Sequence, residues 1–363
     1  MISAENAHLS VAGPVSGPLM EMRGEMVQCT FRFPHSPEIK GISLDLPPYS
    51  RLHPESFQLR QSTSGIWDLQ VELPASSRFL YSFLVKAAPE GKSERFPDPF
   101  NAARLNKDDV RSILETPPAA PYRPPLIPAD RGFLESFEVT TTFLGGSKKI
   151  TVYRPFGYAS TVALPLLIIF DADIYLRDVR SAPVLDELIA ARKITPCIVA
   201  FVENSPETRS VELTCNPDFA RFIHEELLAF LAERFPFNKN IAIGGASFGG
   251  LAAAFIALQY PQTFKKVFSQ SGSFWFKDSS GVPAIQALVQ SSVSTEIKFY
   301  LEYGRHEIEP RGGISLRDAN RQLRETLASR GFAVTTSEFG GGHGAQNWRA
   351  TFADVLTNLL ENY

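Results

Sequence analysis

Alternating apolar and polar residues mark the first third of the chain. Four segments with this period of two lie between short turn signals: MVQCTFRF, GISLDL, IWDLQVEL and RFLYSFLVK, at residues 26–33, 41–46, 66–73 and 78–86. Such alternation predicts strands with one buried face, and several short strands in succession favour a small β-sandwich. We expect Trp67, Tyr81 and Phe83 to face its core, because aromatic side chains dominate core burial. A carbohydrate or ligand platform is the alternative use of these rings.

Continuous apolar runs replace this alternation in the second part of the chain. Buried strands are predicted at LPLLIIF, TPCIVAFV, KNIAIGG, KVFSQSG and IKFYLEYG, at residues 164–170, 195–202, 239–245, 266–272 and 297–304. Helical patterns at residues 219–235 and 250–260 lie between them. Buried strands that alternate with amphipathic helices indicate a mostly parallel sheet covered on both faces. Ligands of such sheets bind beyond the carboxyl ends of the strands.

A proline-rich stretch, PPAAPYRPPLIP at residues 117–128, separates the two patterns. This composition favours an extended conformation and continues neither a helix nor a central strand. We therefore divide the chain into a β-sandwich domain at residues 1–116, a linker at 117–130 and an α/β domain at 131–363.

Composition narrows the class of protein further. The 363 residues carry a formal net charge of only −3, which favours neither nucleic acid nor an anionic membrane as a partner. No apolar run approaches the roughly 20 residues that cross a bilayer, and the first residues lack the apolar core of a secretory signal. Cys29, Cys197 and Cys215 are scattered without metal-ligand spacing, so we expect reduced thiols in a cytoplasmic protein and no metal site.

Ser247 is the candidate nucleophile. It lies in Gly-Ala-Ser-Phe-Gly, directly after the predicted strand KNIAIGG and directly before the predicted helix GLAAAFIALQY. This G-x-S-x-G pattern in a strand–turn–helix context is typical of the nucleophile elbow of α/β-hydrolases, in which the flanking glycines allow close approach of strand and helix. A close-packed turn without chemistry is the alternative. The pattern predicts an α/β-hydrolase domain behind the β-sandwich.

A serine nucleophile needs a base and an acid that orients the base. His343 lies in a glycine-rich loop after the last predicted strand, FAVTTSEF, which suits the chain order serine, acid, histidine. Glu307 follows the strand IKFYLEYG and is the expected acid, with Glu309 and Asp318 as competitors. His306 is an alternative base.

The tetrahedral intermediate of ester hydrolysis needs hydrogen-bond donors for its oxyanion. We expect one donor to be the backbone N–H of Phe248, directly after the nucleophile, and the other to be the N–H of Asp173, after the strand LPLLIIF. Asp171 and Asp173 could instead suggest a metal site, although a turn-capping role is the simpler interpretation of two aspartates.

The sequence resembles the enterochelin (ferric enterobactin) esterase family within the esterase D group of α/β-hydrolases. The resemblance covers nearly the whole chain and is most specific in GGASFGGLAA around Ser247, SQSGSFWF at 269–276, GGHGAQNWR around His343 and the pattern R-x-x-E-L-x-x-N-x-x-F from Arg209. The chain has Gly344 and Ala172 where the family usually has aspartate and glycine. The resemblance implies hydrolysis of the trilactone of a tris-catecholate siderophore, which releases its iron in the cytoplasm.

The same resemblance implies which residues contact the substrate. A ferric tris-catecholate is multiply anionic, so arginines near the strand ends are expected to bind it. We expect Arg209, Glu212, Asn216 and Arg305 to contribute, with surface ion pairs as the alternative role of the arginines. The iron would arrive with the substrate, so neither a cofactor nor a protein metal site is implied.

Two other functions fit the sequence less well. The same triad could cleave another catecholate, feruloyl or acetyl ester, or the fold could serve as a binding protein without catalysis. The partner in each case is a small molecule rather than nucleic acid or a membrane. The sandwich part is the expected place for homodimer contacts or for a lid.

Overall fold

The computed structural model describes residues 17–360 except 63–64, 89–90, 119–124, 127, 160, 279–280 and 294. The chain forms two compact units, of which one contains Met1–Pro121 with Gly340–Gln346 and the other contains Tyr122–Phe339 with Asn347–Tyr363. Half of the predicted linker, residues 119–124 and 127, lies outside the described residues, so its extended conformation stays a prediction. No helix within the described ranges is long and apolar enough to cross a membrane.

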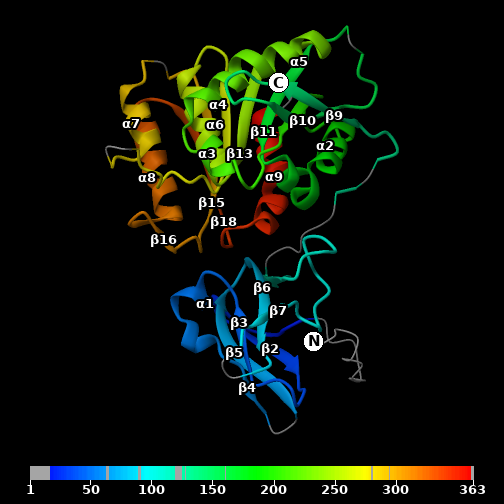
Figure 1. Ribbon diagram of the computed structural model, residues 1–363, viewed down its shortest axis with the longest axis vertical. Coiled ribbons are helices and arrows are strands. Elements are labelled where there is room, and N and C mark those ends of the chain that lie inside the picture. Colours follow the sequence, from blue (N-terminus) through cyan, green and yellow to red (C-terminus); the bar gives the residue numbers. More distant parts are fainter. Residues whose placement is uncertain are drawn as a thin grey trace. The chain divides into compact units, whose positions relative to one another are not determined.

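The first unit consists of two small antiparallel sheets (Figure 1). One has the order β1-β2-β5-β4, and the other has the order β3-β6-β7 with β8 also paired to β6. The bounds are β1 Leu19–Arg23, β2 Met26–Pro34, β3 Gly41–Asp45, α1 Tyr49–Leu52, η2 Pro54–Phe57, β4 Arg60–Gln61, β5 Ile66–Pro74, β6 Ser77–Lys86, β7 Glu94–Phe96 and β8 Ser112–Thr116. All four strands that the alternation predicts are present.

The two small sheets share one apolar core. Alternate residues of β2, β3 and β6 meet in it, as the period of two requires, and Tyr81 and Phe83 are fully buried there. Trp67 is only partly buried against this core. The Tyr81 hydroxyl donates a hydrogen bond of 2.6 Å to Asp98, which gives the one polar atom of this ring a buried partner. The predicted β-sandwich with an aromatic core is therefore present.

The second unit is built on one sheet of eight strands, in the order β18-β15-β14-β13-β11-β12-β10-β9. The strands from β18 to β12 run parallel, whereas β10 and β9 are antiparallel. The strand bounds are β9 Phe133–Thr140, β10 Ser147–Arg154, β11 Leu164–Phe170, β12 Ile198–Val202, β13 Phe237–Ala246, β14 Lys266–Gln270, β15 Lys298–Gly304 and β18 Ala333–Phe339, with a short hairpin of β16 Pro310–Arg311 and β17 Ile314–Ser315. This arrangement confirms the predicted α/β-hydrolase fold.

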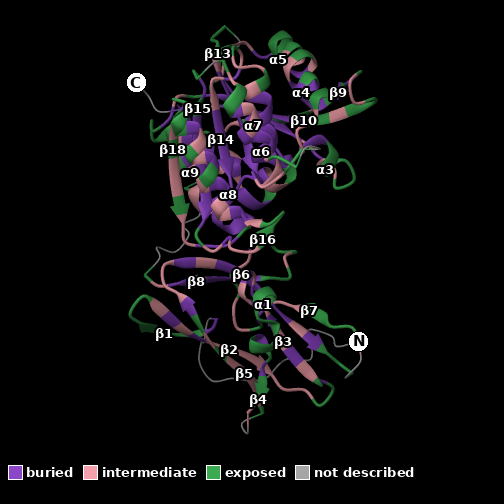
Figure 2. Ribbon diagram, turned by 90° about the vertical axis from the view of Figure 1, so that its left-hand side faces the viewer, coloured by how far each residue is buried: buried purple, intermediate pink, exposed green. Residues whose placement is uncertain are grey.

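Helices follow the strands of this sheet and cover it. Their bounds are η3 Ile174–Val179, α2 Ser181–Ala190, α3 Arg209–Glu212, α4 Pro217–Arg221, η4 Phe222–Leu227, α5 Leu228–Arg234, α6 Phe248–Gln259, α7 Ala284–Ser291, α8 Leu316–Ser329 and α9 Ala345–Leu360. The predicted helix at residues 219–235 is continuous but has the wider π-helical turn over η4. Strand β12, nearly all of β11, the second half of β13 from Ile241 and the middle of α6 are buried (Figure 2).

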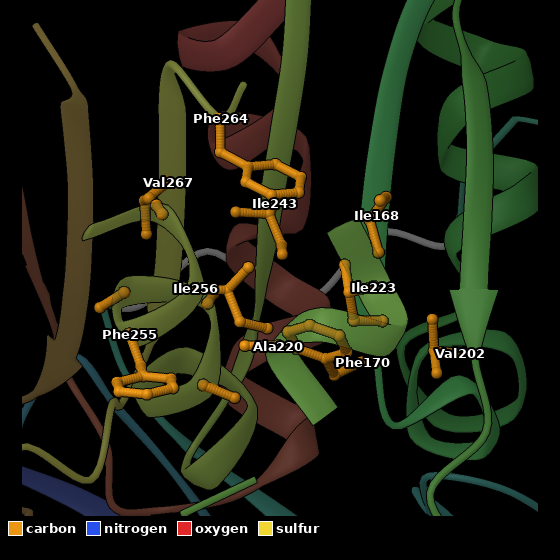
Figure 3. Close-up of a cluster of buried hydrophobic side chains, with 14 of the residues drawn as sticks. Ile168, Phe170, Val202, Ala220, Ile223, Ile243, Phe255, Ile256, Phe264 and Val267 are labelled. Carbon is orange, nitrogen blue, oxygen red and sulfur yellow. The ribbon is translucent and has the colours of Figure 1, made fainter. Parts of the chain in front are cut away.

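The apolar runs of the central strands explain why both faces of the sheet are buried. Ile168 and Phe170 of β11 point toward Ile223 of η4 and Ile256 of α6 (Figure 3), and all four side chains are fully buried. On the opposite face, Tyr175, Phe268 and Phe352 form an aromatic cluster with ring centroids 5.5–6.4 Å apart. Strands with both faces buried need continuous rather than alternating apolar sequence, which is the observed pattern.

A buried carboxyl group lies within this apolar interior. Glu302 of β15 is fully buried and accepts hydrogen bonds from the Gln270 amide at 2.6 Å and from the Thr351 hydroxyl of α9. The Gln270 amide oxygen accepts the Tyr175 hydroxyl at 2.7 Å, so the polar groups of four elements join in one network. Burial raises the pKa of Glu302 to about 7.

This raised pKa predicts that the contribution of Glu302 to stability falls as the pH rises from about 4.5, the ordinary value, to about 7. Within that window Glu302 is protonated more in the folded state than in the unfolded state, so its contribution to the free energy of unfolding falls by at most about 1.4 kcal/mol per pH unit. Denaturant unfolding of wild type and Glu302→Gln at several pH values measures the effect. The glutamine cannot titrate, so the difference between the two proteins should change through this window and become constant above pH 8. A constant difference throughout would contradict the prediction.

Candidate functional site

Ser247 lies on a sharp turn between β13 and α6, as expected of a nucleophile elbow. Its backbone has φ +57° and ψ −119°, a conformation that costs energy for any residue other than glycine. Three hydrogen bonds hold it there: the Ser247 N–H donates to the Gln270 carbonyl at 2.9 Å, and the Ser247 carbonyl accepts from the N–H groups of Leu251 and Ser273. Strain that the surroundings enforce in this way is typical of functional positions.

Two of the glycines around Ser247 are required by close packing. A Cβ on Gly250 would lie 2.3 Å from the Ser269 hydroxyl, and a Cβ on Gly245 would lie 3.0 Å from the backbone of Gly249. Strand, turn and helix can approach this closely only without these side chains. Gly245 therefore has the role that the sequence pattern predicts for the flanking glycines, whereas a Cβ on Gly249 would meet its nearest atoms at an ordinary 3.4 Å.

The Ser247 hydroxyl is half-buried among polar and aromatic neighbours. Its Oγ lies 3.2 Å from the Oγ of Ser273, a residue that sequence reasoning did not single out. The Phe248 ring packs against Trp275 and Phe276, with centroids 6.0 and 6.5 Å apart. The motif SQSGSFWF contains all three of these residues and was the available signal for them.

The two expected oxyanion donors both lie at helix N-termini. Phe248 is the first residue of α6, and Asp173 is the residue immediately before η3. N–H groups at the start of a helix have no partner within the helix, and the helix dipole favours negative charge there. Both positions suit a developing oxyanion, although their role stays a prediction.

Asp171 fixes the turn that leads to Asp173. It has φ +57°, its N–H donates to the Asn204 amide oxygen, and its carbonyl accepts from the N–H groups of Ile174 and Tyr175. Its carboxylate receives two hydrogen bonds from Arg209, of 2.6 and 2.7 Å. Within the described residues, no group of three or more His, Cys, Asp or Glu side chains could hold a metal ion.

Glu307 is the most buried of the three acidic candidates. The residue is 4% exposed just beyond β15, where one carboxylate oxygen accepts the Gly304 N–H at 3.2 Å. Asp318 instead lies in the first turn of α8, where its N–H donates to the capping Ser315 hydroxyl, its carboxylate accepts that hydroxyl, and it pairs with Arg317. These placements favour Glu307 as the acid, and its role stays a prediction.

The two histidine candidates differ in setting. Burial, together with the cations Arg305 and Arg317, lowers the pKa of His306 to about 4, which makes it a weak base. His343 is exposed in the loop of residues 340–346, which groups with the first unit, where the Arg78 N–H of β6 donates to the Gly340 carbonyl. The domain division predicted from the sequence had assigned this loop to the α/β domain.

The residues expected to bind substrate have contrasting partners. The Glu212 carboxylate is buried and accepts hydrogen bonds from Lys148 and Asn204, and the Asn216 side chain caps α4. Arg305, by contrast, is exposed beyond β15, and the described part of the structure gives its guanidinium no ion pair. Of the two arginines expected to bind substrate, Arg305 is therefore the one whose guanidinium is available to an anionic ligand, since Arg209 pairs with Asp171.

Comparison with known proteins shows the family. Residues 141–359 match the family described as "Putative esterase". The chain belongs to this esterase family. The esterase is 27% identical to the iron(III) enterobactin esterase of Escherichia coli K12 over 343 residues, which cover 85% of this chain and 82% of that protein. The resemblance noted in the sequence is thereby confirmed, and the protein is a carboxylic ester hydrolase.

Solved structures show the same fold along most of the chain. The ferric enterobactin esterase of Salmonella typhimurium has a TM-score of 0.81 and 22% identity, and the match covers 94% of this esterase and 96% of that chain. The enterobactin esterase of Shigella flexneri, solved in the presence of enterobactin, has a TM-score of 0.79 and 22% identity, and the match covers 94% and 95%. Both matches extend over the β-sheets of the first unit as well as the hydrolase unit.

The close packing at the elbow predicts that Gly250→Ala destabilises the esterase by about 1–3 kcal/mol, because the added methyl group overlaps Ser269. Gly249→Ala is the matched control, since a Cβ there meets its nearest atoms at 3.4 Å and gains the same helix propensity. Denaturant unfolding of both variants measures the difference. Equal stabilities would show that the elbow tolerates a side chain at position 250.

Proposed function

We propose that this esterase hydrolyses the trilactone ester bonds of a tris-catecholate siderophore such as enterobactin, and thereby releases iron in the cytoplasm. The observation that carries the proposal is the similarity to enterobactin esterases over both units of the chain, combined with the strained, hydrogen-bonded turn at Ser247. A general esterase would need only the hydrolase unit.

The catalytic steps follow from the chemistry of the residues. Ser247 Oγ attacks the ester carbonyl while His343 accepts its proton, and Glu307 stabilises the resulting imidazolium. The N–H groups of Phe248 and Asp173 stabilise the oxyanion. His343 then donates its proton to the departing serine hydroxyl of the trilactone, and a water molecule hydrolyses the acyl-enzyme by the same route.

The surroundings of Ser247 support an aromatic, anionic substrate. Trp275 and Phe276 are partly exposed beside Phe248, and they offer ring faces to a catechol. Arg305 lies at the carboxyl edge of the same sheet, and Arg311 is exposed in the hairpin of β16 and β17. The neighbouring Gly312 contacts Trp275, since a Cβ on that glycine would lie 3.3 Å from the indole. These cations have no ion pair among the described residues, as the binding of a multiply charged ferric complex requires.

The deciding experiment is chromatographic product analysis after incubation with ferric enterobactin. Wild type should release serine-catechol fragments, and Ser247→Ala should release none, since the nucleophile is lost while the pocket remains. A p-nitrophenyl ester reports general esterase activity in parallel. Cleavage of the small ester without cleavage of the trilactone would indicate that the natural substrate is another catecholate, feruloyl or acetyl ester. Trilactone cleavage by Ser247→Ala would contradict the mechanism.

Arg305→Ala should raise KM for the ferric tris-catecholate about tenfold and change KM for a neutral p-nitrophenyl ester less than twofold. Only the charged substrate gains from a free guanidinium at the strand ends. Arg324→Ala on α8 is the control, because it removes a partly exposed arginine of the same unit that pairs with Glu325. Equal effects of Arg305→Ala on both substrates would argue against a contact with the anion.

A further inference from the structure

The Arg209 guanidinium contacts both halves of the proposed oxyanion hole. Its Nε and Nη2 donate to the two carboxylate oxygens of Asp171 at 2.6 and 2.7 Å. The same guanidinium lies over the Phe248 ring, with 5.6 Å from its central carbon to the ring centroid. Asp171 leads into the turn that holds the Asp173 N–H, and Phe248 carries the other donor. One side chain thus joins two elements that the sequence separates widely.

Asp171 in turn lies against the first turn of α6. A Cβ on Gly249 would be 3.4 Å from an oxygen of the Asp171 carboxylate, which is ordinary contact distance. The carboxylate is therefore held between Arg209 and the helix that begins at the nucleophile. Because the Asp171 carbonyl also accepts the N–H groups at the start of η3, any shift of Asp171 moves the Asp173 N–H.

A chain of buried polar contacts supports this pair. The Asn204 side chain accepts the Asp171 N–H and donates to Glu212, and Lys148 donates to both oxygens of Glu212. Asp171, Asn204 and Glu212 are each at most 9% exposed. A buried carboxylate is costly unless charged donors satisfy it, so Asp171 needs the two bonds that Arg209 supplies.

We propose that Asp171 and Arg209 are positioning residues for ester hydrolysis, which hold the Asp173 and Phe248 N–H groups at the spacing that a tetrahedral oxyanion requires. The proposal rests on the proposed role of Ser247 and of these two donors. It differs from the expectation that Arg209 binds the anionic substrate, because the two N–H groups of its fork are used by Asp171. Catalytic donors must be held within about 0.5 Å of the productive position, which a bidentate pair achieves and a single flexible cation does not.

The test is steady-state hydrolysis of a neutral ester, p-nitrophenyl acetate, by Asp171→Asn and Arg209→Lys. Both changes keep nearly the same volume but remove the parallel, charged pair of hydrogen bonds. We expect kcat to fall about 10- to 100-fold with KM within about threefold of wild type, since loss of a whole oxyanion donor costs about 100- to 1,000-fold. The double variant should be no more than about threefold slower than the slower single variant, because the two side chains act as one unit.

Two further measurements separate positioning from folding and from substrate binding. Titration of active sites with a fluorophosphonate gives kcat per reactive serine, and binding of an alkyl boronic acid measures affinity for a tetrahedral adduct. The boronate should bind more weakly in both variants by about the same factor as kcat/KM falls. Arg321→Lys is the matched control, since Arg321 forms a similar bidentate pair with Glu338, with bonds of 2.9 and 2.8 Å, outside the site. It should leave kcat within twofold of wild type.

Three results would overturn the proposal: kcat per labelled serine within twofold of wild type in both variants, loss of activity that only follows the labelled fraction, or an unchanged affinity for the boronate. Failure of the proposed function is seen separately. If Ser247→Ala keeps its activity on p-nitrophenyl acetate, the nucleophile is misassigned. If the fluorophosphonate labels Ser247 of the wild type but Asp171→Asn is as active as the wild type, only the positioning role is refuted.

Discussion

The hydrogen bond from the Ser247 N–H to the Gln270 carbonyl is the contact on which the rest of the site depends. It joins the end of β13 to the end of β14 at the point where the chain turns into α6. Together with the two bonds that the Ser247 carbonyl accepts, it holds the serine at a positive φ and so sets the direction in which the helix starts. The glycines on either side allow the turn, but this bond and those of the Ser247 carbonyl select it.

Gln270 also connects this turn to the interior. Its backbone supports Ser247, while its side chain contacts Tyr175 of η3, Glu302 of β15 and Thr351 of α9. The helix η3 follows the turn of one expected oxyanion donor, and β15 leads to Glu307. A buried polar network of this kind is costly if any member is unsatisfied, and for that reason it specifies one arrangement of the elements around it. The position of the nucleophile is thus tied to the packing of the sheet.

Much of this structure follows from the sequence. Continuous apolar runs such as residues 164–170 had to be strands buried on both faces, and a serine between a strand and a helix with flanking glycines had to lie on a tight turn. Periodicity does not give the direction of a strand, so the antiparallel β9 and β10 at the edge of the sheet were not foreseen. It also gives no information on contacts between distant residues. Arg209 and Asp171 are 38 positions apart, and the sequence alone predicted that Arg209 binds the anionic substrate. The loop of His343 likewise groups with the first unit through contacts that no local pattern encodes.

The backbone at Ser247 has a consequence for how this protein can change over generations. Glycine adopts a φ of +57° with no steric penalty, so glycine at position 247 would relieve the backbone strain that serine has there. Backbone strain therefore disfavours serine at this position, and selection for catalytic activity accounts for its retention. In a lineage that no longer needs hydrolysis, this position is among the first where drift would improve the fold, and its residue is a simple marker of whether the enzyme is still in use.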